Sequence, residues 1–206
     1  MRDTIDINSN DNALFITSQC NNRCVMCCQP PLLRNDLDGY FQKNMALIDS
    51  APRELRSLGI TGGEPTLLGD RLFELLRHVR TKLPETEIHL LTNGRAFADK
   101  EYARKLAECG EEKILLGVPL HADSAGDHDT ITQVKGSFEE TMLGLYNLGR
   151  YDIGIELRVV ITKMNYRRLP KLPDFIYRNL PFVEFISLMG LEYTGYTIKN
   201  RRSEER

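Results

Sequence analysis

The chain has 206 residues, of which 41% are hydrophobic and 27% are charged, a balance typical of a globular protein with one sizeable core. Its formal net charge is −2 and no strongly basic stretch precedes the last residues, which argues against nucleic acid or a membrane surface as the partner. No apolar run reaches the length of a membrane-spanning helix, and the amino terminus lacks the apolar stretch of a signal peptide. We therefore expect a cytoplasmic protein, in a compartment that keeps thiols reduced.

Short runs rich in isoleucine, leucine and valine alternate along the chain with longer segments of helical period. This alternation is typical of βα units that build a parallel sheet. The apolar runs predict six strands, at residues 13–17, 57–61, 87–92, 113–120, 154–161 and 183–188. The segments between them predict five helices, at residues 42–55, 70–81, 99–109, 137–149 and 170–179. Ser137 followed by Glu140 predicts a capping box at the start of the fourth helix.

The segment 123–136 is long and polar. We expect it to be a loop that covers or admits substrate, and a merely solvated loop is an equally acceptable interpretation. His121 and His128 follow the fourth predicted strand, where a titratable side chain could meet substrate, although an isolated histidine is more often structural. Among the nearby carboxylates, Asp123 is the one expected to face a site at that position.

Six strands and five intervening helices predict a partial α/β barrel, although periodicity alone is equally compatible with an open doubly wound sheet. We expect one domain over residues 1–198. Residues 199–206 are charged and lack cysteine, so they are expected to form a frayed tail. This tail marks either the end of a minimal protein or the point at which a longer one is truncated.

Three cysteines, Cys20, Cys24 and Cys27, follow the first predicted strand with the spacing C-x3-C-x2-C. Three thiolates on one loop can hold three irons of a [4Fe-4S] cluster and leave the fourth iron without a protein ligand. Structural zinc is the main competitor, but it uses four ligands, usually as two separated pairs, and the sequence holds no second pair. Cys28 is expected to be a small buried thiol, and Cys109 falls in a predicted helix. The spacing therefore favours a cluster over zinc, with a disulfide further behind.

The cysteine motif resembles that of radical S-adenosylmethionine (radical SAM) enzymes, in which three cysteines carry a cluster that SAM chelates through the unique iron. Further motifs follow in the order seen in that family: Gly62-Gly63-Glu64-Pro65, Thr92-Asn93-Gly94, Arg158 and Met189-Gly190-Leu191. All except Arg158 fall at or just past the carboxyl end of a predicted strand, where barrel active sites are built. The resemblance implies a partial (β/α)6 TIM-like barrel of the radical SAM type, with a [4Fe-4S] cluster and SAM as cofactors.

The resemblance also implies roles for residues near the cluster. Cys20, Cys24 and Cys27 would be the iron ligands. Met26, which stands where the family usually has an aromatic residue, would shield the cluster and adenine. The motif after the second strand would meet the methionine end of SAM: its glycines allow close backbone approach, and its carboxylate adds negative charge. Its members are Gly62, Gly63, Glu64 and Pro65.

Three further contacts with SAM are implied. Asn93 would make a polar contact with SAM or substrate, although Asn-Gly is also a common turn. Arg158 would bind the carboxylate of SAM, with an ion pair to Glu156 or Asp152 as the alternative. The segment expected to lie against adenine consists of Met189, Gly190 and Leu191.

Within the superfamily, the chain looks most like the radical SAM maturase of the His-Xaa-Ser system. The similarity rests on residues 20–31, 159–161 and 188–192. It implies an enzyme that reductively cleaves SAM to a 5′-deoxyadenosyl radical, which takes hydrogen from a small ribosomally made peptide. A flavodoxin or ferredoxin would donate the electron, and no side chain is assigned a catalytic role.

Two other enzymatic interpretations stay open. One is a compact radical SAM enzyme for a small molecule, and the other is an activase that installs a glycyl radical on a partner enzyme. An alternative of a different class is a non-catalytic module for metal binding or peptide recognition. The motifs of the second and fifth strands argue against that alternative, because a purely structural metal site would not need them.

Overall fold

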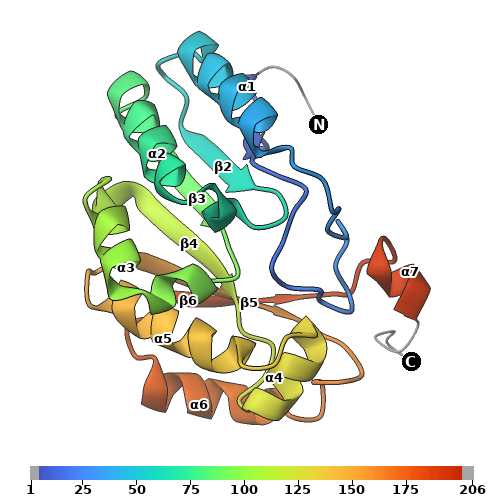
Figure 1. Cartoon of the computed structure of the whole chain (residues 1–206). Helices are drawn as coiled ribbons and strands as arrows, with labels where there is room; N and C mark the ends of the chain where they lie inside the picture. Colours follow the sequence, from blue (N-terminus) through green and yellow to red (C-terminus); the bar gives the residue numbers. More distant parts are fainter. Residues whose placement is uncertain (1–4, 201–206) are drawn as a thin grey trace.

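A single sheet of six parallel strands forms the centre of the protein, and the computed structural model describes residues 5–200 (Figure 1). The strands are β1 (Ala13–Phe15), β2 (Ser57–Thr61), β3 (Glu87–Leu91), β4 (Ile114–Pro119), β5 (Gly154–Val160) and β6 (Phe185–Met189). They pair in the order β1-β2-β3-β4-β5-β6, with every neighbour parallel. A doubly wound sheet would reverse its order at a switch point. The predicted partial (β/α)6 barrel is therefore confirmed.

The helices are α1 (Leu37–Ser50), α2 (Asp70–Lys82), α3 (Lys100–Ala107), α4 (Ala125–Thr132), α5 (Ser137–Gly149), α6 (Leu172–Asn179) and α7 (Tyr196–Asn200). Short 3-10 turns occupy Pro65–Leu68 (η1), Arg95–Ala98 (η2), Glu111–Lys113 (η3) and Leu169–Lys171 (η4). The predicted helix 42–55 is wrong at both ends. Its C-cap, Ala51, has extended backbone because Pro52 follows it, and a residue before proline avoids the helical region.

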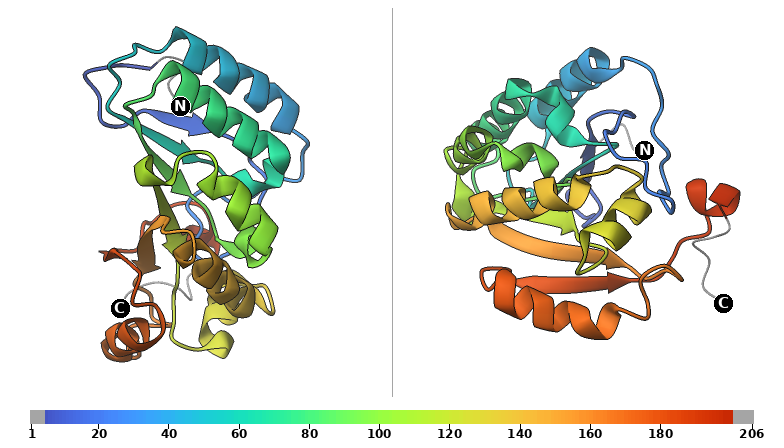
Figure 2. Two further views of the ribbon diagram at one scale, coloured as in Figure 1. Left: turned by 90° about the vertical axis from the view of Figure 1, so that its left-hand side faces the viewer. Right: turned by 60° about the horizontal axis from the view of Figure 1, so that its bottom comes forward.

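The core lies between the helices and the convex face of the sheet, as the two views of Figure 2 show. Alternate strand residues point to opposite faces. The residues on the convex face are buried: Leu58, Ile60, Ile88, Leu90, Leu116, Val118, Ile155, Leu157 and Val159. Each such side chain contributes about 1.5–3 kcal/mol when fully buried. The opposite face lines the open barrel lumen and carries His89, Gly117, Glu156 and Arg158.

The segment 123–136, predicted to be a loop, contains the helix α4. The capping box predicted at Ser137 is also wrong. Gly136 is the N-cap of α5, and Asp129 takes over the capping role. Its carboxylate accepts hydrogen bonds from the amides of Gly136 (2.6 Å) and Phe138 (2.8 Å) and from the Ser137 hydroxyl (2.9 Å). The side chain that caps α5 therefore comes from the preceding helix.

His121 and His128 are buried against each other, with ring centroids 5.7 Å apart. Nδ1 of His128 accepts a hydrogen bond from the amide of His121 (3.3 Å). Burial lowers the pKa of His121 to about 3 and that of His128 to about 4. Both rings are therefore neutral near pH 7, and the structural interpretation fits them. Asp123 is paired with Arg168 (2.8 Å).

Lys199 and Asn200, predicted to begin a frayed tail, are the last two residues of α7. The predicted boundary at residue 198 thus falls inside a helix, and residues 201–206 lie outside the described part of the chain. Between residues 5 and 200, no helix is long and apolar enough to cross a membrane.

Candidate functional site

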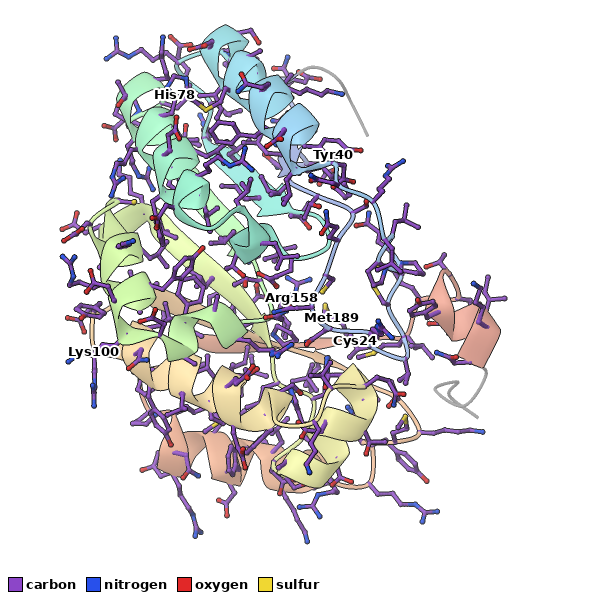
Figure 3. All side chains as sticks on the ribbon, viewed as in Figure 1. Cys24, Tyr40, His78, Lys100, Arg158 and Met189 are labelled. Carbon is purple, nitrogen blue, oxygen red and sulfur yellow. The ribbon has the colours of Figure 1, made fainter. Side chains whose placement is uncertain are left out.

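The three cysteines of the motif lie on one irregular connection between β1 and α1, residues 16–36, which we call the cysteine loop. Cys20, Cys24 and Cys27 are free and partly buried. In the view of Figure 3, Cys24, Arg158 and Met189 project onto one region of the molecule. Asn93 bonds to Asn21, and Glu64 acts on Cys20, so the structure brings the cysteine loop together with the motifs that follow β2 and β3, where barrel active sites are found.

The three thiols share a poorly solvated site. Burial and the nearby Glu64 raise the pKa of Cys20 to about 11, and burial together with the other two thiols raises the pKa of Cys24 to about 12. Burial also raises the pKa of Cys27. Thiolates crowded in this way need a positive centre, and a bound metal deprotonates the thiols that it coordinates. The donor set therefore fits a metal centre.

The two kinds of metal centre place different demands on the donors. Between residues 5 and 200, no three histidine, cysteine or carboxylate side chains converge on one ion. A tetrahedral zinc site requires such convergence, whereas a [4Fe-4S] cluster takes each thiolate on a different iron. Cys20, Cys24 and Cys27 would hold three of its irons.

The two remaining cysteines are not assigned to this set. Cys28 is exposed, so the expectation of a buried thiol is wrong. Cys109 is buried, and its thiol donates to the carbonyl of Lys105 (3.3 Å). It follows α3 in a turn instead of lying within the helix, as had been predicted.

The neck of the cysteine loop is closed by hydrogen bonds between its two ends. Asp36, at the end of the loop, accepts from the hydroxyl of Thr17 (2.5 Å) and from the amide (3.1 Å) and hydroxyl of Ser18. The amide of Leu32 donates to the carbonyl of Ser18 (2.8 Å). These hydrogen bonds therefore join the start of the cysteine loop, just after β1, to its end, just before α1.

The turn after β3 fixes the first half of the cysteine loop. Nδ2 of Asn93 donates to Oδ1 of Asn21 (2.5 Å). Nη1 of Arg95 donates to the carbonyl of Asn21 and to Oδ1 of Asn22 (both 2.8 Å), while its Nε pairs with Glu140 (2.6 Å). Sequence reasoning missed Arg95, although it directly follows the Thr92-Asn93-Gly94 motif.

The carboxyl end of α4 fixes the middle of the cysteine loop. The amide of Arg23 donates to the carbonyl of Thr132 (3.0 Å), and the amide of Val25 donates to the carbonyl of Ile131 (2.9 Å). The last turn of a helix leaves its carbonyls without helical partners. The amides of Arg23 and Val25 therefore supply hydrogen-bond partners for the carbonyls at the end of α4. These bonds fix that part of the cysteine loop.

The segment 195–200, which includes α7, fixes the second half of the cysteine loop. The amide of Tyr196 donates to the carbonyl of Cys27 (2.9 Å), and Nδ2 of Asn200 donates to the carbonyl of Val25 (2.8 Å). Gly195 has a φ of 54°, and a Cβ there would overlap the carbonyl of Cys27. Only glycine allows this approach without strain. Nothing in the sequence pattern predicted these contacts.

Met26, expected to shield the cluster, is buried, and its carbonyl lies 3.4 Å from the hydroxyl of Thr197 in α7. Its apolar side chain is therefore shielded from solvent on the segment between the second and third cysteines. That position is compatible with the implied shielding role.

The glycines after β2 face the protein backbone. A Cβ on Gly62, whose φ is 140°, would lie 2.7 Å from the carbonyl oxygen of Thr17, and a Cβ on Gly63 would overlap the carbonyl of Gln19. The amide of Gly63 donates to the carbonyl of Thr17 (2.6 Å). Pro65 then begins η1. Packing against the start of the cysteine loop is therefore enough to require both glycines.

Glu64 is fully buried and cross-links two turns. Its carboxylate accepts from the amide (3.1 Å) and hydroxyl (2.8 Å) of Thr66, from the hydroxyl of Thr92 (2.6 Å) and from the amide of Asn93 (2.7 Å). Burial raises the pKa of Glu64, although these hydrogen bonds lower it. Its negative charge acts on Cys20, but direct contact with a ligand would require these bonds to be displaced.

Arg158 lies in the lumen within a polar cluster. Its Nη1 pairs with Glu156 (3.2 Å), which is one of the two ion pairs expected as the alternative, and its Nη2 donates to Sδ of Met189 (3.1 Å). Glu156 is almost fully buried and also meets His89 (2.8 Å) and the hydroxyl of Ser187. A buried carboxylate needs such partners. Glu156 therefore fixes the guanidinium near the cysteine loop.

Two glycines leave space around this cluster. A Cβ on Gly117 would lie 2.9 Å from Cδ of Arg158 and 3.0 Å from Nε2 of His89, so glycine makes room for both side chains. A Cβ on Gly190 would meet nothing within 4 Å, and Leu191 after it is only partly buried. Internal packing therefore does not explain Gly190, and the space beside it is open.

A family model described as the radical SAM superfamily matches residues 14–176. The chain is 33% identical over 167 residues to the Fe-coproporphyrin III synthase of Methanosarcina barkeri. It is 28% identical over 168 residues to a protein of Metallosphaera sedula named "Probable GTP 3′,8-cyclase". These alignments cover 78% and 80% of this chain but only 39% and 51% of the relatives. The chain therefore spans about half of their length or less.

Solved structures agree with the fold. The chain resembles the crystal structure of Streptococcus suis SuiB bound to S-adenosylmethionine, with a TM-score of 0.71 at 19% identity, over 94% of this chain and 43% of that one. SuiB bound to the precursor peptide SuiA also matches, with a TM-score of 0.67 at 16% identity, over 94% and 41%. At these identities the likeness shows the fold.

The donor set predicts which thiols a reconstituted cluster needs. Replacing Cys20, Cys24 or Cys27 with alanine removes one iron ligand, so we expect each variant to lose the cluster. Cys28→Ala and Cys109→Ala are the matched controls and are expected to keep it, because neither thiol belongs to the set. Iron and acid-labile sulfide analysis of the five variants measures this, and a complete cluster in Cys24→Ala would contradict the ligand assignment.

The contacts of α7 predict that the cysteine loop depends on it. Gly195→Val places a side chain against the carbonyl of Cys27, and we expect most of the bound iron to be lost. Asn200→Ala removes one hydrogen bond, of about 0.5–1.5 kcal/mol, and should speed alkylation of the loop thiols in the metal-free protein. The control is Ile198→Ala, an exposed side chain on the same helix. Iron content and alkylation rates equal to the control in both variants would show that α7 does not fix the loop.

Proposed function

The chain belongs to the radical SAM superfamily of enzymes, and from this we propose that it modifies a small ribosomally made peptide. A [4Fe-4S] cluster and SAM are the characteristic cofactors of the superfamily. When bound, a cluster reduced by an external donor would pass one electron to SAM, and the resulting cleavage to methionine and a 5′-deoxyadenosyl radical would supply the chemistry that takes hydrogen from the substrate. The protein positions these groups and excludes water.

The observation that carries the proposal is the cysteine loop itself. Three partly buried thiols with the spacing C-x3-C-x2-C lie on the connection after β1, and Cys28, which follows the third of them, is exposed. Such a set would leave one iron free to bind SAM. The loop is fixed on every side, so Cys20, Cys24 and Cys27 are held in place for a cofactor.

Arg158 is the side chain that we propose for the carboxylate of SAM. Its Nη1 is committed to Glu156, while Nε makes no hydrogen bond to the described residues. A guanidinium has five donors, so it can keep the carboxylate of Glu156 and still bind a second one. Met26 and the open space beside Gly190 would accommodate the adenosyl group.

The turns after β2 and β3 support the same site indirectly. Gly62, Gly63 and Pro65 shape the first turn, and Glu64 ties it to Asn93 in the second. Asn93 then contacts the cysteine loop. We propose that these residues position the cofactors mainly through the loop, with backbone groups of the first turn available to the amino group of SAM.

The proposal of a peptide substrate rests on the similarity to the His-Xaa-Ser maturase and is supported by the likeness of the fold to SuiB in complex with its precursor peptide. A flavodoxin or ferredoxin is the electron donor that we propose. The second candidate is a small-molecule enzyme, because the relatives include a synthase for Fe-coproporphyrin III and a protein named as a cyclase of GTP.

Reconstitution tests the proposed chemistry. After anaerobic addition of iron and sulfide, we expect SAM and dithionite to yield 5′-deoxyadenosine, which chromatography detects. Cys24→Ala treated in the same way should yield none. A protein that binds about four irons per chain, as a [4Fe-4S] site demands, and still forms no 5′-deoxyadenosine would contradict the proposal.

Binding of SAM tests the role of Arg158. Arg158→Met removes the proposed partner of the SAM carboxylate, and a hydrogen bond to a charged group contributes about 1.5–3 kcal/mol. We therefore expect SAM to bind roughly ten- to a hundredfold more weakly. Glu156→Gln, which releases the guanidinium from its anchor, should weaken binding by a smaller factor, and Arg158→Lys should fall between wild type and Arg158→Met.

Equilibrium dialysis of SAM against reconstituted protein without reductant gives these constants, and iron analysis shows whether each variant keeps its cluster. Arg178→Met, which removes an exposed arginine of α6, is the control. If Arg158→Met binds SAM as tightly as Arg178→Met while both retain iron, then Arg158 only pairs with Glu156 and does not bind SAM.

A further inference from the structure

A cavity of about 660 Å³ opens beside the cysteine loop, between this loop, α4 and α7. Its volume falls within the range of ligand sites. The side chains that define its character are Arg23, Thr130, Gln133, Met164, Tyr196 and Lys199. Figure 1 shows the tip of the loop lying between α4 and α7, away from the convex face of the sheet.

The cavity carries two positive charges that the described residues do not neutralise. Arg23 comes from the loop and Lys199 from α7, and no carboxylate belongs to the lining. Within residues 5–200 neither cation forms an ion pair, and Lys199 lies 5.8 Å from the ring centroid of Tyr196. Two like charges at one cavity repel each other, and an anionic ligand would relieve that repulsion.

A second cavity, of about 450 Å³, shares Arg23 and Tyr196 with the first. It reaches Cys20, and its lining combines the polar side chains of Gln19 and Asn21 with an apolar group that includes Leu32 and Leu33. Leu33 is 99% exposed, which is unusual for leucine in a loop that is otherwise fixed. The two cavities therefore adjoin at Arg23 and Tyr196, and we call them together the groove; one part carries Arg23 and Lys199, and the other carries the two leucines and reaches Cys20, a proposed iron ligand.

We propose that this groove binds an extended segment of the substrate peptide, with a carboxylate side chain between Arg23 and Lys199 and an apolar side chain against Leu32 and Leu33. The proposal rests on the proposed function and names the docking surface of its substrate. Charge complementarity selects an acidic residue at one end, and the apolar lining selects a hydrophobic residue at the other.

The groove suits a carboxylate better than the phosphates of a nucleotide. Polyphosphate sites generally use helix N-termini or runs of backbone amides. Here Thr130 and Gln133 place the cavity at the carboxyl end of α4, where the helix dipole is negative. The negative end of α4 offsets part of the charge of the two cations, and the remainder suits a single carboxylate better than the several charges of a polyphosphate.

Two labelled peptides test the proposal. One is a fluorescein dodecapeptide in which leucine and glutamate alternate with single glycines between them, and the other has glutamine in place of glutamate. Fluorescence anisotropy at low ionic strength, where charge pairs are least screened, gives their dissociation constants. We expect the glutamate peptide to bind at least about tenfold more tightly than the glutamine peptide.

Three variants locate the contact. Arg23→Gln and Lys199→Gln should each remove most of the preference for glutamate, and Leu33→Ser should weaken both peptides equally. Lys100→Gln carries the same loss of charge on the side of the molecule opposite Cys24 in Figure 3, and it should behave as wild type. Equal binding of the two peptides to wild type, or the same constants in Lys199→Gln and Lys100→Gln, would overturn the proposal.

A third probe, GTP as a competitor, separates the two candidate substrate classes. Displacement of the glutamate peptide by GTP, at concentrations where acetate has no effect, would overturn the peptide assignment. Formation of 5′-deoxyadenosine without any peptide reports the proposed function independently. If the protein cleaves SAM but binds the two peptides equally, only the proposal for the groove is wrong. If it binds the glutamate peptide preferentially but does not cleave SAM, only the proposed chemistry is wrong.

Discussion

The irregular backbone of the cysteine loop is the constraint on which the rest of the site depends. A loop that must present three thiols in a fixed arrangement cannot rely on helical or strand hydrogen bonds, so its polar groups need partners elsewhere. Asp36 closes its neck, Arg95 and α4 hold its first half, and α7 holds its second half. The residues that decide the geometry of the cluster site therefore lie mostly outside the cysteine motif.

A buried carboxylate organises the lumen in the same way. Glu156 would be costly to bury alone, and it is matched by Arg158, His89 and Ser187 from three different strands. Gly117 makes this possible, because any side chain there would collide with Arg158 and His89. The sheet thus carries its polar groups on the concave face without weakening the apolar convex face.

The sequence predicted most of the sheet because strands buried against helices appear as apolar runs, and only strand ends were displaced by a residue or two. Two helices were missed: α4, because its eight residues show no apolar periodicity, and α7, because its five residues make little more than one turn. Spacing identified the candidate cysteines. It could not identify the partners of the loop, because a backbone carbonyl accepts a hydrogen bond whatever its side chain, so the acceptors at Val25 and Cys27 leave no trace in the sequence.

The glycine motif after β2 illustrates how one pattern can have two causes. Close approach to a ligand and close approach to the protein itself both select glycine. Here the face of Gly63 that lacks a side chain is filled by the backbone of Gln19, immediately before the first cysteine. A larger residue at this position would push the start of the cysteine loop away from β2 and move Cys20 with it. The motif can therefore be required for the cluster site whether or not its backbone also meets SAM.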